Sequence, residues 1–228
     1  MASTASNPFE ESEDSEERAS VEDWFAIPED MGAELVGGRI VYKGAPGAAH
    51  SRAQMGLMEL LRAPYHRKTS IKDKPGGWWI AVDTDMDLAD LGCRPDVLGW
   101  RRDKHATMPA PALPALVTAV PSWICEILSP STAHLDMGDK RVSYHRAGVQ
   151  HYWLADPTNG TLTVLQWAAH GYVAALVASR GEKVHAAPFV EVEIDITQLF
   201  GEEGDKEPSS GPAPSSRSRA AMSIDSDE

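Results

Sequence analysis

The first part of the chain alternates short apolar runs with turn residues, around one longer run of helical spacing. Residues 31–42 form two extended segments about a Gly-Gly turn at 37–38, which predicts a β-hairpin. Apolar residues over 55–61 have a mixed spacing consistent with an amphipathic helix, which we expect to stop near Pro64. Residues 78–88 alternate apolar and acidic side chains in their second half, a pattern typical of a half-exposed strand.

Two further apolar runs, residues 94–100 and 122–128, are short and bounded by turn residues, so we expect deeply buried strands. Each run carries one carboxylate. The second run is followed at 129–132 by Ser and Thr residues that favour a helix N-cap, and then by a helical segment at 136–147. Gly148 is expected to end that helix.

The last part of the predicted domain is rich in strands. Residues 151–156 and 161–167 flank a turn at 157–160 and predict a second hairpin. Further expected elements are a strand pair at 172–178 and 190–192, followed by residues 196–200. A strand, helix and strand with hairpins on both sides predict an α/β sandwich with a mixed central sheet, and an α+β arrangement also fits.

The charge of the chain lies mostly at its two ends. The formal net charge is −13, but residues 1–23 hold eight acids against one base, and residues 201–228 hold seven acids against three bases. Both segments are poor in large apolar residues, so we expect disordered acidic tails that serve solubility or, as the alternative, cover a basic site. The single folded domain is expected at 24–200, where acids and bases nearly balance.

Composition excludes several classes of protein. No run approaches the roughly 20 apolar residues that cross a bilayer, so no membrane span is expected. The first residues lead into acidic sequence rather than into a basic and then apolar stretch, which predicts no secretory signal. We therefore expect a cytoplasmic protein.

Asp96 and Glu126 are the candidate chemical groups, because a carboxylate inside a buried strand must be paired or hold a metal. If the two strands are neighbours, both acids form an oxygen-rich pocket for magnesium or manganese, with the carbonyl of Ile127 as a third ligand. The alternative is that each acid caps a turn or pairs with an arginine such as Arg94.

The two cysteines are expected to be reduced core residues. They form no Cys-x-x-Cys motif, and no histidines stand at zinc-ligand spacing. Cys93 precedes Asp96 by three residues and Cys125 precedes Glu126 by one, and both offsets are odd. Since side chains alternate along a strand, both thiols should point away from the face that carries the acids.

Lys140 lies on the helix predicted after the Glu126 strand. A phosphodiester attacked by water needs a cation near the nucleophile or the scissile phosphate, and Lys140 is a candidate for that role. The alternative is a solvated helix lysine that pairs with Asp136, four residues earlier. Sequence position leaves both interpretations open.

A series of motifs, in order along the chain, resembles the Uma-type restriction endonuclease family, a bacterial branch of the PD-(D/E)xK nuclease superfamily. The resemblance covers about residues 30–200. The matching motifs are Glu34-Leu35-Val36-Gly37-Gly38-Arg39-Ile40-Val41, His50, Arg94-Pro95-Asp96-Val97, Cys125-Glu126-Ile127-Leu128-Ser129-Pro130-Ser131-Thr132, Asp136 through Lys140 with Tyr144, and 147–157, which contains Tyr152-Trp153-Leu154-Ala155-Asp156-Pro157.

The resemblance implies a restriction-endonuclease-like core in which Asp96 and Glu126 hold a divalent metal. The superfamily lysine stands two residues after the acid, where this chain has Leu128, and the family pattern instead places a lysine on the next helix, matching Lys140. Two earlier positions also match. Glu34 is implied as an extra metal ligand or orienting group, and His50 as a phosphate contact.

Contact with DNA requires positive charge. Residues 39–74 contain eight bases against two acids, and further bases follow the Asp96 strand. We expect salt-dependent contact with phosphates, and a solvated surface is the alternative for any one of these bases. The candidate contacts are His50, Arg52, Arg94, Arg101 and Arg102.

The sequence thus predicts a magnesium-dependent or manganese-dependent DNA endonuclease, and many nucleases with this core are homodimers. The alternative is a catalytically silent protein of the same fold that binds nucleic acid or a partner. A role in DNA repair or in a mobile element would change its partners rather than its chemistry.

Overall fold

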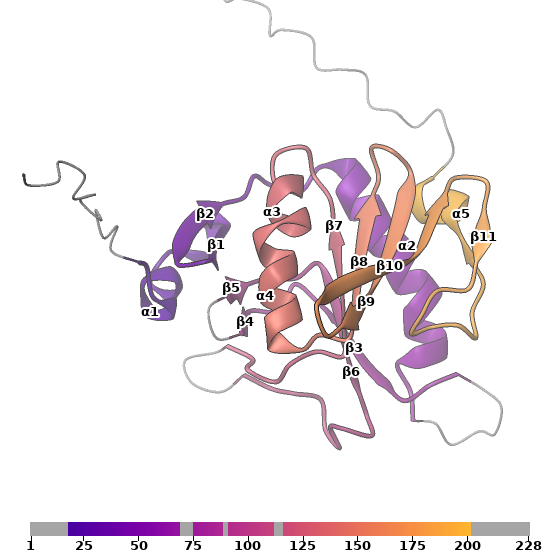
Figure 1. Cartoon of the computed structure of the whole chain (residues 1–228), viewed down its shortest axis with the longest axis horizontal. Coiled ribbons are helices and arrows are strands. Elements are labelled where there is room, and N and C mark those ends of the chain that lie inside the picture. The colour runs from indigo at the N-terminus through magenta and orange to yellow at the C-terminus, as the bar shows by residue number, and fades with distance from the viewer. Residues whose placement is uncertain (1–17, 69–74, 89–90, 112–115, 202–228) are drawn as a thin grey trace, which may run out of the picture.

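The computed structural model describes residues 18–68, 75–88, 91–111 and 116–201, which form a large mixed sheet, a smaller sheet and flanking helices (Figure 1). The large sheet has six strands in the order β10-β9-β8-β7-β6-β3. Its β7 and β8 are parallel, and its other neighbouring strands are antiparallel. The strands are β3 (Trp78–Val82), β6 (Val97–Arg101), β7 (Trp123–Ile127), β8 (His151–Asp156), β9 (Thr161–Ala168) and β10 (Gly171–Ser179).

The smaller sheet has four strands in the order β2-β1-β5-β4. They are β1 (Ala33–Val36), β2 (Arg39–Tyr42), β4 (Met86–Asp87) and β5 (Leu91–Cys93). The predicted hairpin is confirmed: β1 and β2 pair about Gly37 and Gly38, whose φ angles of 59° and 79° favour glycine. Two short helices precede it, α1 (Val21–Phe25) and the 3-10 helix η1 (Glu29–Met31).

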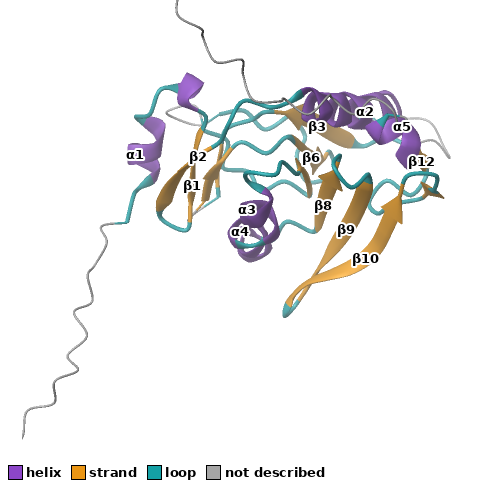
Figure 2. Ribbon diagram, turned by 90° about the horizontal axis from the view of Figure 1, so that it is seen from above, coloured by secondary structure: helices purple, strands orange, loops and turns teal. Residues whose placement is uncertain are grey.

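Helices cover both faces of the six-stranded sheet (Figure 2). Side chains that alternate along the central strands enter two different clusters, as the strand period requires. Trp123, Cys125 and Ile127 pack with one pair of helices, whereas Ile124 and Leu128 pack on the opposite side. The first pair is α2 (Ala48–Tyr65) and α5 (Ile196–Phe200), and the other side carries α3 (Ala133–Met137) and α4 (Asp139–Ala147).

Two predicted elements are divided. The strand expected over 78–88 becomes β3 and β4 in different sheets, because the chain turns at Asp83, a non-glycine residue with a φ of 45°. The helix expected over 136–147 becomes α3 and α4, which meet at Gly138. A Cβ at Gly138 would lie 2.7 Å from the carbonyl oxygen of His134, so the break requires glycine.

The C-terminal strand pair was predicted correctly in its first strand, since residues 172–178 lie within β10, and wrongly in its second. Residues 190–192 form no strand, and a short antiparallel pair joins β11 (Lys183–Val184) to β12 (Ile194–Asp195). The residues that follow are helical as α5, because the Asp195 carboxylate accepts hydrogen bonds from the backbone N–H groups of Thr197 and Gln198. A local cap therefore decides the conformation of this segment.

The cysteine orientation is confirmed for Cys125 and wrong for Cys93. Cys125 packs on the α2 side of β7, away from Glu126. Cys93 ends β5 in the smaller sheet, and the chain turns through Arg94 before β6 begins, so alternation does not carry through to Asp96. Cys93 therefore lies in the cluster on the α4 side, and both cysteines are buried and free.

Most of the two predicted acidic tails lies outside the described residues. Residues 18–23, which the sequence pattern assigned to the first tail, are described and include the start of α1. Ser20 and Asp23 cap that helix reciprocally. Within the described ranges, no helix is both long enough and apolar enough to span a bilayer.

Gly92 in β5 provides a test of how the N-terminal helix docks. A Cβ on Gly92 would overlap the indole ring of Trp24, which is buried and donates a hydrogen bond to the carbonyl of Ala33. We expect Gly92→Ala to lower the free energy of unfolding by about 1–3 kcal/mol through overpacking. Gly44→Ala is the control, because a Cβ there meets nothing within 4 Å. Urea denaturation measures both, and equal stability of the variants would contradict the packing.

Candidate active site

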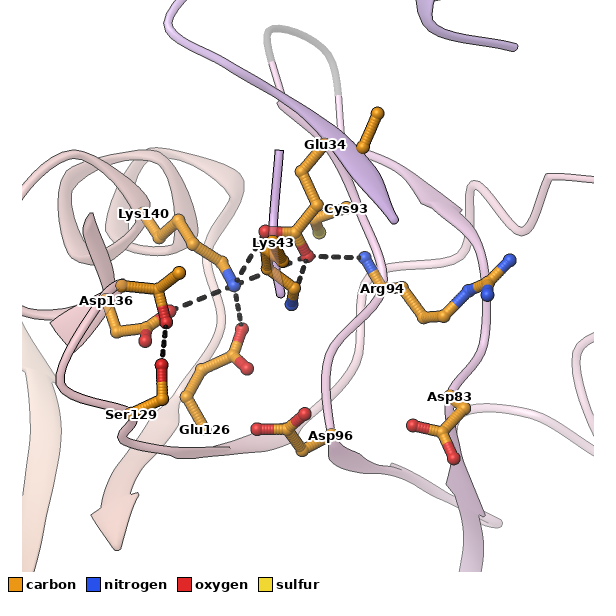
Figure 3. A network of polar contacts seen from close by, with 12 residues as sticks. Glu34, Lys43, Asp83, Cys93, Arg94, Asp96, Glu126, Ser129, Asp136 and Lys140 are labelled. Atoms are coloured by element: carbon orange, nitrogen blue, oxygen red, sulfur yellow. Dashed lines mark hydrogen bonds and ion pairs between the residues drawn. The ribbon is translucent and has the colours of Figure 1, made fainter. Parts of the chain in front are cut away.

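Three of the acids considered in the sequence surround the ammonium of one buried lysine (Figure 3). Lys140 Nζ lies 2.6 Å from Glu126 Oε1 and 3.0 Å from Asp136 Oδ1. Glu34 Oε2 is 3.3 Å from the same atom. The Lys140 side chain is 1% exposed, so it is not a solvated helix lysine, although its predicted pairing with Asp136 is present.

Strand register brings Asp96 and Glu126 side by side. In β6 and β7, Val97 pairs with Cys125, and continuing this antiparallel register by one residue sets Asp96 opposite Glu126. Asp96 precedes β6, and its Oδ2 accepts a 2.6 Å hydrogen bond from the Ile127 backbone N–H. In Figure 3 one Glu126 oxygen contacts Lys140 and the other points towards Asp96.

His50 and Gln54 of α2 hold Asp96 from the other side. His50 Nε2 is 3.2 Å from Asp96 Oδ1, and the Gln54 amide donates to the Asp96 backbone carbonyl at 2.9 Å. Burial raises the pKa of Asp96, but the hydrogen bond and charge of His50, with the charge of Lys43, bring that pKa below its ordinary value. Asp96 is therefore an ionised carboxylate, held by His50 at one oxygen and by the Ile127 N–H at the other.

The pKa of Glu126 is shifted in the opposite direction from that of Asp96. Its side chain is buried, and its Oε1 accepts a 2.6 Å hydrogen bond from the Tyr144 hydroxyl. Burial, and then the negative charges of Asp136 and Asp96, raise the pKa of Glu126 to about 8, although Lys140 acts in the other direction. Two neighbouring carboxyl groups thus have pKa values moved apart by their surroundings.

Glu34 of β1 is held by a backbone group and two lysines. Its Oε1 accepts hydrogen bonds from the Lys43 ammonium at 2.9 Å and from the Arg94 backbone N–H at 3.0 Å. Burial raises the pKa of Glu34, but the charges of Lys140 and Lys43 bring it below its ordinary value. Glu34 therefore links the smaller sheet to the acids of the larger one.

A cavity of about 960 Å³ opens beside these groups. Its inner wall includes Glu34, Lys43, Asp96, Ile127 and Asp136, whereas Glu126 and Lys140 do not line it. The outer wall carries apolar and acidic residues: Trp24, Phe25, Pro28, Pro46, Glu29, Asp30, Asp83 and Asp85. A ligand in the cavity reaches one side of the acidic cluster, and Lys140 lies behind that side.

The predicted phosphate contacts lie in different surroundings. His50 lies on Asp96, as described above, and Arg52 is exposed on α2 outside the cavity wall. The Arg94 side chain lines the cavity but pairs with Asp85 at 2.8 Å, rather than with Asp96 as the alternative interpretation supposed.

Arg101 and Arg102 are not brought to the acids. Asp96 precedes β6 and Arg101 ends it, which separates them by about 16 Å at the usual rise of a strand. Arg101 pairs with Asp103 at 3.0 Å, and the Arg102 guanidinium lies 3.2 Å from the centroid of the Trp79 ring. These arginines therefore belong to the opposite end of the sheet.

The sequence pattern did not predict that Lys43, Gln54 and Tyr144 contact the acids of the site. Lys43 was counted among the bases without a role, yet it follows Val41, the strand partner of Glu34, by two residues. Because side chains alternate along a strand, Lys43 lies on the same face of the hairpin as Val41 and therefore as Glu34. The hairpin register thus predicts that Lys43 lies close to Glu34. Tyr144 follows Lys140 by four residues, a spacing that puts both on one helix face.

Glu126 makes the stability of the metal-free protein depend on pH. Its pKa is about 8 when folded and near the ordinary 4.5 when unfolded, so the folded state binds an extra proton between these values. The free energy of unfolding therefore falls as pH rises through this window, by up to about 1.4 kcal/mol per pH unit. We expect Glu126→Gln, which cannot titrate, to flatten this dependence.

Chemical denaturation in EDTA from pH 5 to pH 8 measures the difference between the variant and the wild type. Glu59→Gln, on the exposed face of α2, is the matched control and should keep the wild-type slope. Identical slopes for Glu126→Gln and the wild type would contradict the assignment.

Comparison with known proteins agrees with the fold and the motifs. The sequence model of the family described as "Putative restriction endonuclease" matches residues 19–198. A similar solved structure is that of a "putative nuclease belonging to DUF820" from Anabaena variabilis, with a TM-score of 0.61 and 18% identity over 78% of this chain and 96% of that chain. No curated protein matches. Because this family model matches most of the chain, the chain belongs to the Uma2 family, described as "Putative restriction endonuclease".

Proposed function

We propose that the protein is a metal-dependent endonuclease that hydrolyses phosphodiester bonds in DNA. The observation that carries the proposal is the pair of carboxylates, Asp96 and Glu126, held side by side on neighbouring strands, with Asp96 lining the cavity and Glu126 buried next to it. The family description supports DNA as the substrate, because restriction endonucleases act on DNA.

The chemistry of the acidic cluster suits a divalent cation. Among the described residues, no three side chains of His, Cys, Asp or Glu form a ready metal site. Magnesium, however, is often bound by one or two carboxylates together with water. Four acids meet two lysines here, so full ionisation of the cluster would leave an excess of negative charge that a divalent cation would offset; the members are Glu34, Asp96, Glu126, Asp136, Lys43 and Lys140.

Asp96, Glu126 and the carbonyl of Ile127 would hold magnesium or manganese. When bound, such an ion makes water a stronger nucleophile and polarises a phosphodiester. The raised pKa of Glu126 reports the mutual repulsion and burial of these carboxyl groups, which a cation would relieve. Glu34 contacts the ammonium groups of both Lys43 and Lys140. We therefore assign Glu34 to orienting these two lysines rather than to binding the metal.

The surrounding residues fix these ligands in place. His50 and the Ile127 N–H each hold one oxygen of Asp96, and Tyr144 and Lys140 hold one oxygen of Glu126. Arranged in this way, the carboxylates need little reorganisation when charge develops on a phosphate in the cavity. The homodimer remains a prediction.

Cleavage of supercoiled plasmid tests the proposal. We expect the wild type to nick DNA with magnesium or manganese and not with EDTA. Asp96→Asn and Glu126→Gln should each lower the rate by about 10²-fold or more, since each removes a charge on which the reaction depends. Glu59→Gln is the control and should cut like the wild type, because Glu59 is exposed on α2.

Full activity of Asp96→Asn would refute the assignment of the site. Absence of any metal-dependent product, together with salt-dependent affinity for DNA, would instead favour the catalytically silent binding protein.

A further inference from the structure

The two lysines of the acidic cluster differ in their access to a ligand. The Lys140 side chain is 1% exposed and is absent from the cavity wall, whereas the Lys43 side chain is 25% exposed and lines the cavity. Both ammonium groups contact Glu34. A phosphate that enters the cavity therefore meets Lys43 before Lys140.

The hydrogen-bonding capacity of Lys140 is already used. An ammonium group has three N–H donors. Carboxylates from three elements surround it, with Glu126 at 2.6 Å, Asp136 at 3.0 Å and Glu34 at 3.3 Å. Moving Lys140 towards a substrate would leave these acids without their counter-ion in a buried site, which is costly.

Lys43 keeps donors for a ligand. Within the described ranges, Glu34 is its one ion-pair partner, at 2.9 Å, which takes one of three N–H groups. In Figure 3 the Lys43 ammonium lies on the side of Glu34 that faces Glu126 and Asp96. Burial and the charge of Lys140 lower the pKa of Lys43, but Glu34, Glu126 and Asp96 raise it above its ordinary value, so the group stays charged at neutral pH.

The backbone holds Lys43 at this position. The residue follows β2, and its N–H donates to the carbonyl of Gly32 at 2.8 Å, which extends the pairing of β1 with β2 by one step. Gly32 has a φ of 60°, and a Cβ there would lie 2.9 Å from the Lys43 carbonyl oxygen. The close approach of these two backbones therefore depends on glycine.

We propose that Lys43 is the catalytic cation that contacts the substrate phosphate, and that Lys140 is a positioning residue that acts through Glu126 and Glu34. The inference rests on the proposed nuclease function. In the hydrolysis, a water oxygen forms a bond to phosphorus and the bond to the leaving oxygen breaks. The proton that the water loses is balanced by the proton that the leaving oxygen gains. Lys43 remains protonated and stabilises charge on a non-bridging oxygen.

The test compares Lys43→Gln, Lys43→Arg and Lys140→Met with the full-length wild type. Lys43→Gln should lower kcat for plasmid cleavage by about 10²-fold. In EDTA, the slope of log K against log salt for binding a DNA duplex should become shallower by about 0.9, the value for one lost phosphate contact. Its Tm should stay near that of the wild type, because glutamine still donates to Glu34.

Two further variants separate contact from positioning. Lys43→Arg should restore the salt slope and part of the rate, since arginine keeps the charge. Lys140→Met should lower Tm by roughly 10 °C or more, because it leaves buried acids without a counter-ion. Lys183→Gln removes the same charge from β11, where the side chain is 58% exposed, and should match the wild type in all three measurements.

Wild-type cleavage by Lys43→Gln would overturn the inference and leave the proposed function intact. A lower rate with an unchanged salt slope would also overturn it, because Lys43 would then act without touching phosphate. Absence of metal-dependent cleavage by the wild type itself would refute the proposed function, and the inference with it.

Discussion

The fold is organised around one buried ammonium group. The Lys140 side chain is only 1% exposed, and the acids that pair with it come from the smaller sheet, the larger sheet and the helix before its own. A buried charge is tolerated only with well-placed partners, so these elements must pack around Lys140 for the domain to form. Packing of the two sheets and assembly of the acidic site are therefore a single structural requirement.

Crowding of carboxyl groups gives each acid a different character. Asp96 and Glu34, with cations close by, have pKa values below the ordinary range, whereas burial and neighbouring acids raise the pKa of Glu126 to about 8. The pKa values of residues of one chemical type are thus shifted in opposite directions by their surroundings. Such divergence of pKa values is common at functional sites.

The two lysines differ in whether a ligand in the cavity can reach them. The motif that identifies the family leads to Lys140, but the cavity reaches the cluster from the side of Asp96, Ile127 and Lys43. Lys43 follows the β1–β2 hairpin and Lys140 lies on α4, so the two positive charges reach Glu34 from different elements. The smaller sheet therefore contributes to the site as directly as the nuclease core does.

The sequence by itself determined the fold class, the first hairpin, the buried strands with Asp96 and Glu126, and the family. These depend on local periodicity, turn residues and motifs, which can be read along the chain. Only the tertiary structure decided that Lys140 is caged, that Arg94 pairs with Asp85, and that Arg101 lies at the far end of β6. The sequence pattern also did not predict the break at Asp83 or the partial exposure of Lys43. Local patterns describe which way a side chain points along its own element, whereas contact and access depend on how separate elements pack together.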